Sequence, residues 1–215
     1  MGEQEVAAAV GRPMLAELRE RTGELHTQAE RHPVQAALVR GQSGVGGYVS
    51  YLSQMWHIHA ALENELGRRL GSAVLGPVAT SQFRAEAIVE DLATFDGAQV
   101  EPPVEPVTRF VSAVQDLQDA ALLGMHYVLE GSTNGGRFIA MAIRKGLGLE
   151  GERGTRYLDP YGEAQKATWG AFCAAMSELS LDAAERERVI TGAERMFGLI
   201  IETFDAMTEG STAAS

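Results

Sequence analysis

The sequence has one cysteine, few basic residues and no long apolar run, and each deficit excludes a class of protein. A lone Cys173 cannot form an internal disulfide, which is typical of a reducing compartment such as the cytosol. Its neighbours are apolar, so we interpret it as a buried, inert thiol. The 215 residues include 18 Lys and Arg against 29 Asp and Glu, a formal net charge of −11. Nucleic-acid binding is therefore not expected, because phosphate neutralisation needs a basic surface.

No segment of the chain reads as a targeting signal or a membrane span. The N-terminal residues 1–13 are acidic and lack the basic start and apolar stretch of a signal peptide. No run approaches the roughly 18 uninterrupted apolar residues of a membrane helix. We therefore predict a cytoplasmic protein that does not interact with a membrane.

Apolar residues recur with helical spacing almost throughout, and no run of alternating residues bounded by turn residues indicates a strand. The pattern predicts an all-α fold of roughly six to eight helices. We expect one domain over residues 11–208, with frayed tails at 1–10 and 209–215. The expected helices are one from Pro13 to just before Pro33, then 48–70, 81–95, a long or broken helix over 108–146, 162–179 and 182–207.

Five histidines are the first candidates for metal or acid–base chemistry. His57 and His59 lie about 200° apart on a helix and cannot chelate one metal. His59 and Glu63 share a face and could bind one, although most such pairs are only a helix-surface interaction. His32 precedes Pro33, which predicts a surface or capping role. No histidine has a glutamate three residues before it, which argues against a ferritin-type di-iron centre.

His26 lies on one helix face with Arg19, about 10 Å along the axis. A histidine ligand with a cation at that distance could hold a flat metal complex with peripheral carboxylates. The alternative is a partly buried histidine hydrogen-bonded to Glu24 or Glu30, with Arg19 solvated. These residues alone leave both readings open.

The stretch "GSTNGG", residues 131–136, interrupts a helical pattern with three glycines. Each glycine costs about 1 kcal/mol relative to alanine in a helix interior. Gly131 and Gly135 are one turn apart and Gly136 adjoins them, so one side of the helix is nearly bare backbone that a planar ligand can approach. Tight helix packing and a loop between two helices are the alternatives. The regular spacing of apolar residues on both sides favours a continuous, kinked helix.

Two motifs resemble the heme oxygenase family. "LRERTGELHTQAE" (18–30) is similar to the family's proximal helix, and "YVLEGSTNGGRFIA" (127–140) resembles the distal helix of its bacterial, biliverdin-producing branch. The resemblance extends over about residues 14–207. It implies an all-α, single-domain helical bundle with heme between the proximal helix and a kinked distal helix.

The resemblance also implies a role for each residue of the two motifs. His26 would be the axial iron ligand and the one metal-binding residue, with Glu30 fixing its tautomer. Gly131 and Gly135 would line the distal face as catalytic positions, with dioxygen close to their backbone. The other implied heme contacts are a basic residue and a hydroxyl near the propionates, a third distal glycine and an aromatic ring at the porphyrin edge: Arg19, Tyr127, Gly136 and Phe197.

Two departures bear on the chemistry. Animal members of the family carry an aspartate where this chain has Ser132, the third catalytic position. A hydroxyl can relay a proton through water but cannot hold a charge. The basic residues with which animal members clamp the propionates correspond to Trp169 and Cys173.

The resemblance implies a heme oxygenase that uses O2 and external electrons to cleave heme, both its cofactor and its substrate, to biliverdin, Fe2+ and CO. The electrons would come from a ferredoxin or a reductase, or from ascorbate in vitro, because the chain shows no flavin or dinucleotide fingerprint. The products suit iron acquisition or chromophore supply to a phytochrome. One alternative is a non-catalytic heme-binding or heme-sensing protein on the same fold. Another is a related fold member acting on a thiamine- or quinone-type substrate, whose typical active-site cysteine is not evident.

Overall fold

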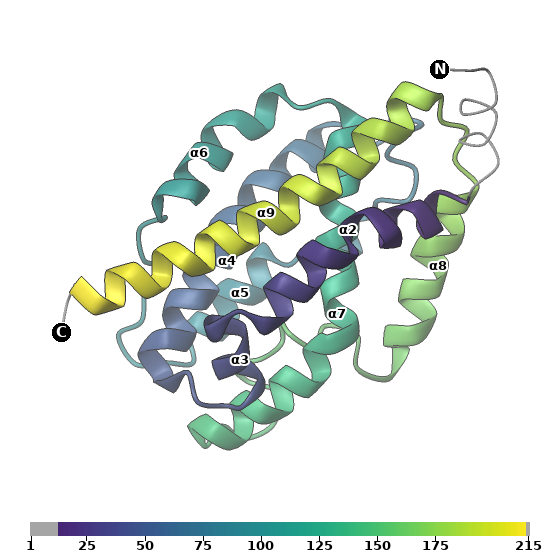
Figure 1. Cartoon of the computed structure of the whole chain (residues 1–215). Helices are drawn as coiled ribbons and strands as arrows, with labels where there is room; N and C mark the ends of the chain where they lie inside the picture. Colours follow the sequence, from purple (N-terminus) through teal and green to yellow (C-terminus); the bar gives the residue numbers. More distant parts are fainter. Residues whose placement is uncertain (1–12, 214–215) are drawn as a thin grey trace.

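The computed structural model describes residues 13–213, and this part of the chain folds into α-helices and short 3₁₀ helices without a strand (Figure 1). The predicted all-α class is confirmed. In chain order the α-helices are α2 (Met14–Arg31), α3 (Pro33–Val39), α4 (Gly44–Arg68), α5 (Ala85–Leu92), α6 (Glu105–Ala113), α7 (Asp119–Leu147), α8 (Gln165–Ser177) and α9 (Ala183–Ala213). The 3₁₀ helices are η1 (Thr80–Gln82), η2 (Val114–Asp116) and η3 (Gly162–Ala164). No helix in the described part is both long and apolar enough to cross a membrane.

The first helix ends where the proline predicts. His32 adopts an extended conformation before Pro33, and its Nδ1 accepts a hydrogen bond of 3.2 Å from the Val34 N–H. Its Nε2 lies 3.2 Å from a carboxylate oxygen of Asp205 on α9. The predicted capping role of His32 is confirmed.

Several helix boundaries differ from the expectation. The short α3 was not predicted, and α4 begins at Gly44, inside a glycine-rich stretch that reads as a loop. The segment expected to be helical over 108–146 is broken at Leu117 and Gln118, which adopt extended conformations. The expected tail at 1–10 lies outside the described residues. At the other end α9 continues to Ala213, five residues beyond the domain end expected at residue 208.

Helix α9 packs against both α7 and α2. Its contact with α7 is so close that a Cβ atom on Gly124 would lie 1.8 Å from the carbonyl oxygen of Val189. On the α9 side, a Cβ atom on Gly192 would lie 2.2 Å from the carbonyl oxygen of Ala121. These glycines allow the two backbones to touch. Helix α9 also packs extensively along α2, so one element fixes the positions of both motif-bearing helices.

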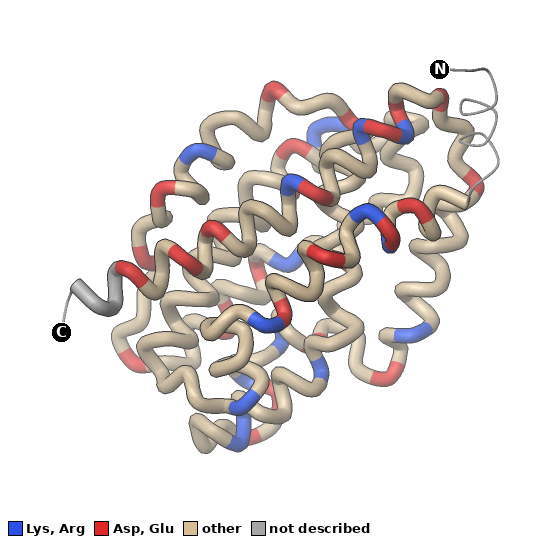
Figure 2. Tube along the Cα trace, viewed as in Figure 1, with Lys and Arg blue, Asp and Glu red and all other residues tan. Residues whose placement is uncertain are grey.

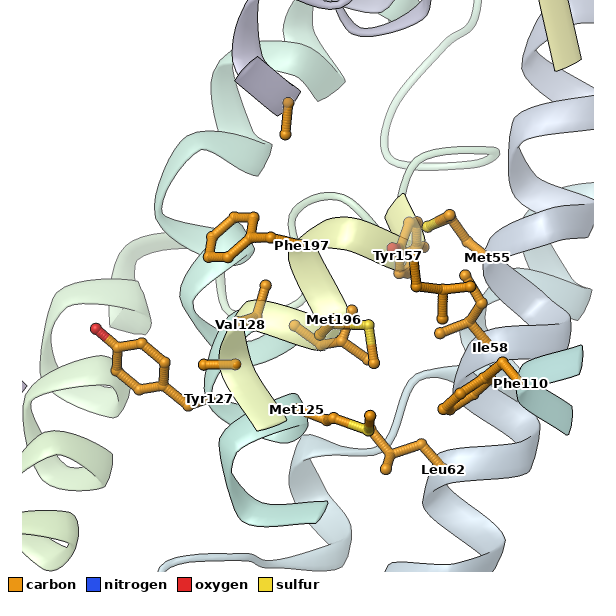
Figure 3. Close-up of a cluster of buried hydrophobic side chains, with 14 of the residues drawn as sticks. Met55, Ile58, Leu62, Phe110, Met125, Tyr127, Val128, Tyr157, Met196 and Phe197 are labelled. Atoms are coloured by element: carbon orange, nitrogen blue, oxygen red, sulfur yellow. The ribbon is translucent and has the colours of Figure 1, made fainter. Parts of the chain in front are cut away.

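The core fills the space between α4, α6, α7 and α9. Figure 3 shows side chains from these helices in one apolar cluster, including Met55, Leu62, Phe110 and Met196. Burying such a side chain contributes roughly 1.5–3 kcal/mol. Tyr127 points out of the cluster toward α8 (Figure 3), and its ring lies 5.5 Å from that of Trp169. The hydroxyl end of Tyr127 therefore leaves the core.

Candidate active site

His26 lies on the exposed side of α2, with an edge of its ring against α9. Its side chain is 55% exposed, and its Nδ1 lies 3.5 Å from a carboxylate oxygen of Glu30 one turn further on. Its ring is 5.5 Å from the ring of Phe197, at an interplanar angle of 73°. The structure therefore brings together three of the residues predicted for the site, and among residues 13–213 His26 Nε2 has no polar partner.

Arg19 and Tyr127 connect α2 to α7. Burial raises the pKa of the Tyr127 hydroxyl, while the charge of Arg19 and a hydrogen bond from it act in the opposite direction. Arg19 precedes His26 by two turns on α2, and Tyr127 precedes Gly131 by one turn on α7. In Figure 1, α2 and the second half of α7 both run toward the lower left. From the Arg19–Tyr127 contact, the two helices therefore continue with the histidine on one and the glycines on the other.

The glycine-rich stretch is helical throughout, as the apolar spacing predicted, and Figure 1 shows α7 changing direction part-way along its length. The glycines face different surroundings. A Cβ atom on Gly135 would meet nothing within 4 Å, and one on Gly131 would lie 3.3 Å from the Trp169 ring. A Cβ atom on Gly136 would lie 1.9 Å from the carbonyl oxygen of Leu158. We therefore assign Gly136 to packing against the loop at Leu158, and its expected contact with heme stays a prediction.

These surroundings predict opposite effects for two neighbouring substitutions. Gly135→Ala should raise the free energy of unfolding by about 1 kcal/mol, because alanine is the better helix former and the added methyl has room. Gly136→Ala should lower it by roughly 1–3 kcal/mol, because the methyl meets backbone that cannot move aside. Urea denaturation of the two variants measures both effects. Equal stabilities would contradict the assigned orientations.

Ser132, Trp169 and Cys173 complete this part of the structure. Ser132 is an exposed residue, and its hydroxyl donates a hydrogen bond of 2.7 Å to the carbonyl oxygen of Leu129. The Trp169 ring packs over Gly131 and stacks on Phe172 at 5.7 Å. Cys173 is half-buried, so the prediction of a buried thiol is wrong, although burial raises the pKa of the thiol and so lowers its reactivity. The side of α8 next to Tyr127 is thus aromatic, and Arg19 brings a cation from α2.

Comparisons with known proteins identify the family. The heme oxygenase family model matches residues 12–206. The heme oxygenase of Xanthomonas campestris pv. campestris is 32% identical over 162 residues, which cover 75% of this chain and 90% of that protein. The chain belongs to the heme oxygenase family. Human heme oxygenase 1 is 29% identical over 203 residues, which cover 89% of this chain and 70% of the human protein.

Solved heme oxygenases share the fold. The crystal structure of heme oxygenase-1 from the cyanobacterium Synechocystis in complex with heme superposes with a TM-score of 0.84 at 19% identity, covering 94% of this chain and 96% of that one. The structure of heme oxygenase from Leptospira interrogans gives a TM-score of 0.81 at 22% identity, with coverages of 90% and 98%. The predicted family and fold are confirmed.

The residues of this heme oxygenase fit a heme. The His26 ring is accessible, and donation of its Nδ1 proton toward Glu30 would leave Nε2 free to bind iron. Gly135 presents backbone with open space where a side chain would stand. Arg19 and the Tyr127 hydroxyl offer one cation and one donor, which match the propionates of a porphyrin.

A buried ion pair lies beside the first distal glycine of this heme oxygenase. The Arg84 guanidinium donates a short hydrogen bond to the Glu130 carboxylate, and their side chains are 3% and 0% exposed. The Tyr161 hydroxyl donates to the same carboxylate at 2.9 Å, while its ring centroid lies 4.9 Å from the guanidinium carbon. The three residues join η1–α5, α7 and the loop before α8, so they fix Glu130 and the adjoining Gly131. Burial raises the pKa of Glu130, and Arg84 opposes that shift.

The His59–Glu63 pair lies buried at the start of α5. His59 Nδ1 lies 2.8 Å from Glu63 Oε1, and no third ligand of the His, Cys, Asp or Glu types joins them within the described part of the chain. The Glu63 carboxylate accepts hydrogen bonds from the backbone N–H groups of Arg84 (2.6 Å) and Ala85 (3.1 Å). A carboxylate at the start of α5 stabilises that helix through its dipole.

His126 is buried, and it predicts a pH-dependent stability. Burial, with help from the charges of Arg84 and His59, lowers the pKa of His126 from 6.5 to about 3. Between pH 6.5 and 3, His126 is therefore protonated in the unfolded chain but neutral in the folded chain. The contribution of neutral His126 to the free energy of unfolding is complete above pH 6.5 and is lost as pH falls from 6.5 toward 3. Lowering the pH from about 7.5 to about 5.5 should cost about 1.4 kcal/mol through this group.

His126→Gln should remove that part of the pH dependence. Glutamine can keep a hydrogen bond to Gln82, whose Oε1 lies 3.0 Å from His126 Nε2. Urea unfolding of wild type and variant at the two pH values gives the difference. An identical loss of stability in both proteins would show that His126 is not the group responsible.

Sequence reasoning did not find Arg84, Glu130 or Tyr161. The three come from segments far apart in the chain, and nothing in their local patterns links them. The loop that carries Tyr161 is anchored by Asp91, which accepts hydrogen bonds from the backbone N–H groups of Arg156 (3.0 Å) and Tyr157 (2.8 Å). Burial raises the pKa of Asp91 to about 6.

Proposed function

We propose that this chain is a heme oxygenase that cleaves heme to biliverdin, Fe2+ and CO with O2 and electrons from an external donor. The carrying observation is the accessible His26 on α2, held between Glu30 and Phe197, with the bare backbone at Gly135 in the corresponding stretch of α7. Heme when bound supplies the oxygen-activating chemistry and is also the molecule consumed.

The protein's own residues bind and orient this substrate. His26 is the iron ligand, and Glu30 holds its Nδ1 proton so that Nε2 is the donor atom. Arg19 and the Tyr127 hydroxyl bind a propionate, while Phe197 limits rotation of the His26 ring. This assignment is supported by the contacts among the five side chains.

Gly135 would leave room for a bound heme beside α7, because a Cβ atom there would meet nothing within 4 Å, and Gly131, under the Trp169 ring, would line the same site. Ser132 donates its own proton to Leu129 and keeps lone pairs on its hydroxyl oxygen, so it can accept a hydrogen bond from water. Water held at Ser132 would deliver protons in place of a carboxylate. The proposed proton source is therefore a chain of hydrogen-bonded water molecules and not a carboxylate side chain.

The electrons come from a ferredoxin or a reductase, a choice supported by the lack of a flavin or dinucleotide fingerprint in the sequence. The products are biliverdin, which a phytochrome can accept as chromophore, and iron, which the cell can acquire. A cytoplasmic location is supported by the single Cys173.

The experiment is a hemin titration followed by ascorbate and catalase in air. The proposal predicts a Soret band that forms at one equivalent of hemin and then decays as a biliverdin spectrum appears. A Soret band that persists under these conditions would instead favour a heme-binding or heme-sensing protein. Failure to bind hemin would overturn the proposal altogether.

A further inference from the structure

Residues 158–165, which end at the first residue of α8, contact the glycine-rich stretch of α7 at three points and are hereafter the support segment. The first contact is close packing, because the Leu158 carbonyl oxygen lies against the backbone of Gly136. The second is the hydrogen bond of 2.9 Å that the Tyr161 hydroxyl donates to the Glu130 carboxylate. The support segment thus touches both ends of the stretch.

The third contact lies between these two and joins α8 directly to α7. The side-chain amide of Gln165 donates a hydrogen bond of 2.6 Å to the Thr133 hydroxyl and lies 3.4 Å from Asn134 Oδ1. The Thr133 hydroxyl in turn donates to the Glu130 carbonyl oxygen at 2.6 Å. Thr133 is only 4% exposed, so water has little access to this hydroxyl and Gln165 is its donor.

Side chains hold several carbonyl groups in this part of α7. Ser132, Thr133 and Asn134 each donate to the carbonyl oxygen three residues earlier, at 2.7, 2.6 and 2.9 Å. Such bonds compete with the regular backbone ladder and often bend a helix. Among residues 13–213, Gln165 is the one residue outside α7 that forms a hydrogen bond with these three side chains. The course of α7 at the glycines therefore depends in part on Gln165.

The support segment meets α7 on the side away from the proposed heme. Residues two apart on a helix point about 200° apart, so Thr133 lies on the face opposite Gly131 and Gly135. A change at the Thr133 contact therefore moves the backbone of the glycines without altering any group that faces the heme.

The chain just before the support segment is bonded to α4, α5 and α7. Tyr48 donates a hydrogen bond of 2.8 Å to the Gly154 carbonyl oxygen, and Arg144 Nε donates one of 2.7 Å to the Thr155 hydroxyl. Asp91 accepts the two backbone hydrogen bonds described above. Because this base is fixed, the contacts of the support segment set the position of the glycine-rich stretch.

We propose that Gln165 is a positioning residue that determines which meso carbon of heme is oxidised, an inference that rests on the proposed function. In the proposed site a bound heme lies beside the backbone of Gly131 and Gly135, so the position of that backbone decides which part of the porphyrin edge is open to oxygen. The hydrogen bond from Gln165 to Thr133 holds the backbone in one position. It thereby restricts the reaction to one biliverdin isomer.

The test uses substitutions that remove this hydrogen bond and keep the approximate shape of each side chain. Gln165→Met removes the donor, and Thr133→Val removes the acceptor. Thr133→Ser keeps the hydroxyl and serves as the conservative variant. Lys166→Met is the control at the next residue of α8. Figure 2 shows an acidic position followed by a basic one where the chain enters α8, and Lys166 is exposed.

Hydrogen exchange of the heme-free protein measures the positioning without any turnover. Amide exchange over residues 130–138 should be about tenfold faster in Gln165→Met and at least as fast in Thr133→Val, because loss of a partly buried hydrogen bond makes local opening easier. The double variant should exchange no faster than Thr133→Val alone, since both substitutions remove the same bond. Thr133→Ser and Lys166→Met should exchange as wild type. Unchanged exchange in Gln165→Met would overturn the inference.

Chromatography of the biliverdin formed with hemin and ascorbate tests the consequence for the reaction. The wild type should give mainly one isomer. In Gln165→Met and Thr133→Val the share of the other isomers should rise by up to about tenfold, with the hemin affinity and the Soret maximum unchanged because the His26 side of the site is intact. A mixture from the wild type, or a wild-type isomer composition in both variants, would overturn the inference.

The two measurements separate this inference from the proposed function. A wild type that makes no biliverdin would contradict the proposed function. Faster exchange in Gln165→Met would in that case still assign Gln165 to the positioning of α7.

Discussion

Replacing His26 with alanine is expected to abolish axial ligation and to reduce biliverdin formation by more than about a hundredfold. Partners of a metal ligand already account for roughly 10–100-fold in affinity or activity, so loss of the ligand itself should exceed that range. The fold should be unaffected, because the His26 side chain is 55% exposed. The hemin titration should lose the Soret maximum of the histidine complex, and the ascorbate assay gives the rate.

Added imidazole serves as the control for this substitution. It should restore the spectrum of the His26→Ala complex, since the site keeps Phe197 and Glu30 around the missing ring. Glu30→Gln should give a smaller loss, roughly tenfold. If His26→Ala kept the wild-type spectrum and rate, another residue would be the ligand.

Replacing Arg84 with methionine is expected to destabilise the protein by about 3–5 kcal/mol. Glu130 would then be a buried carboxylate with only the Tyr161 hydroxyl as partner, and its already raised pKa would rise further. That loss is a large part of the roughly 5–15 kcal/mol that holds a domain together. Urea denaturation near neutral pH measures it.

The double variant Arg84→Met with Glu130→Leu separates the effect of breaking the ion pair from the effect of changing the packing around it. Removing both charges should cost much less than removing one, because no unpaired charge stays buried. A double variant that is as unstable as Arg84→Met would show that packing around Arg84, and not the ion pair, is what matters.

Helical periodicity predicted the fold class and most of the long helices, because a helix with one apolar face carries its pattern in its own residues. The errors occur where local signals conflict. The glycine-rich residues 44–47 resemble a loop but begin α4, and Leu117 breaks the helix expected over 108–146 without proline or glycine. The seven-residue α3 is too short to show a period and depends on the His32 cap and contacts with α7.

The α2 side of the site was predictable, since His26, Glu30 and Arg19 lie on one helix at fixed spacings. The surroundings of the glycines on α7 could be predicted only in part. Sequence shows that Gly135 and Gly136 lack side chains, but not that one faces open space and the other a carbonyl of the loop at Leu158. The Arg84–Glu130–Tyr161 cluster depends wholly on tertiary folding. No local pattern predicts a partner 46 residues away.

The most direct test of the account is a crystal structure of the protein with heme. We expect iron within coordination distance of His26 Nε2, the backbone of Gly131 and Gly135 on the opposite face of the porphyrin, and a propionate at Arg19 and Tyr127. A heme bound through another histidine, or seated away from α2 and α7, would contradict the proposed site.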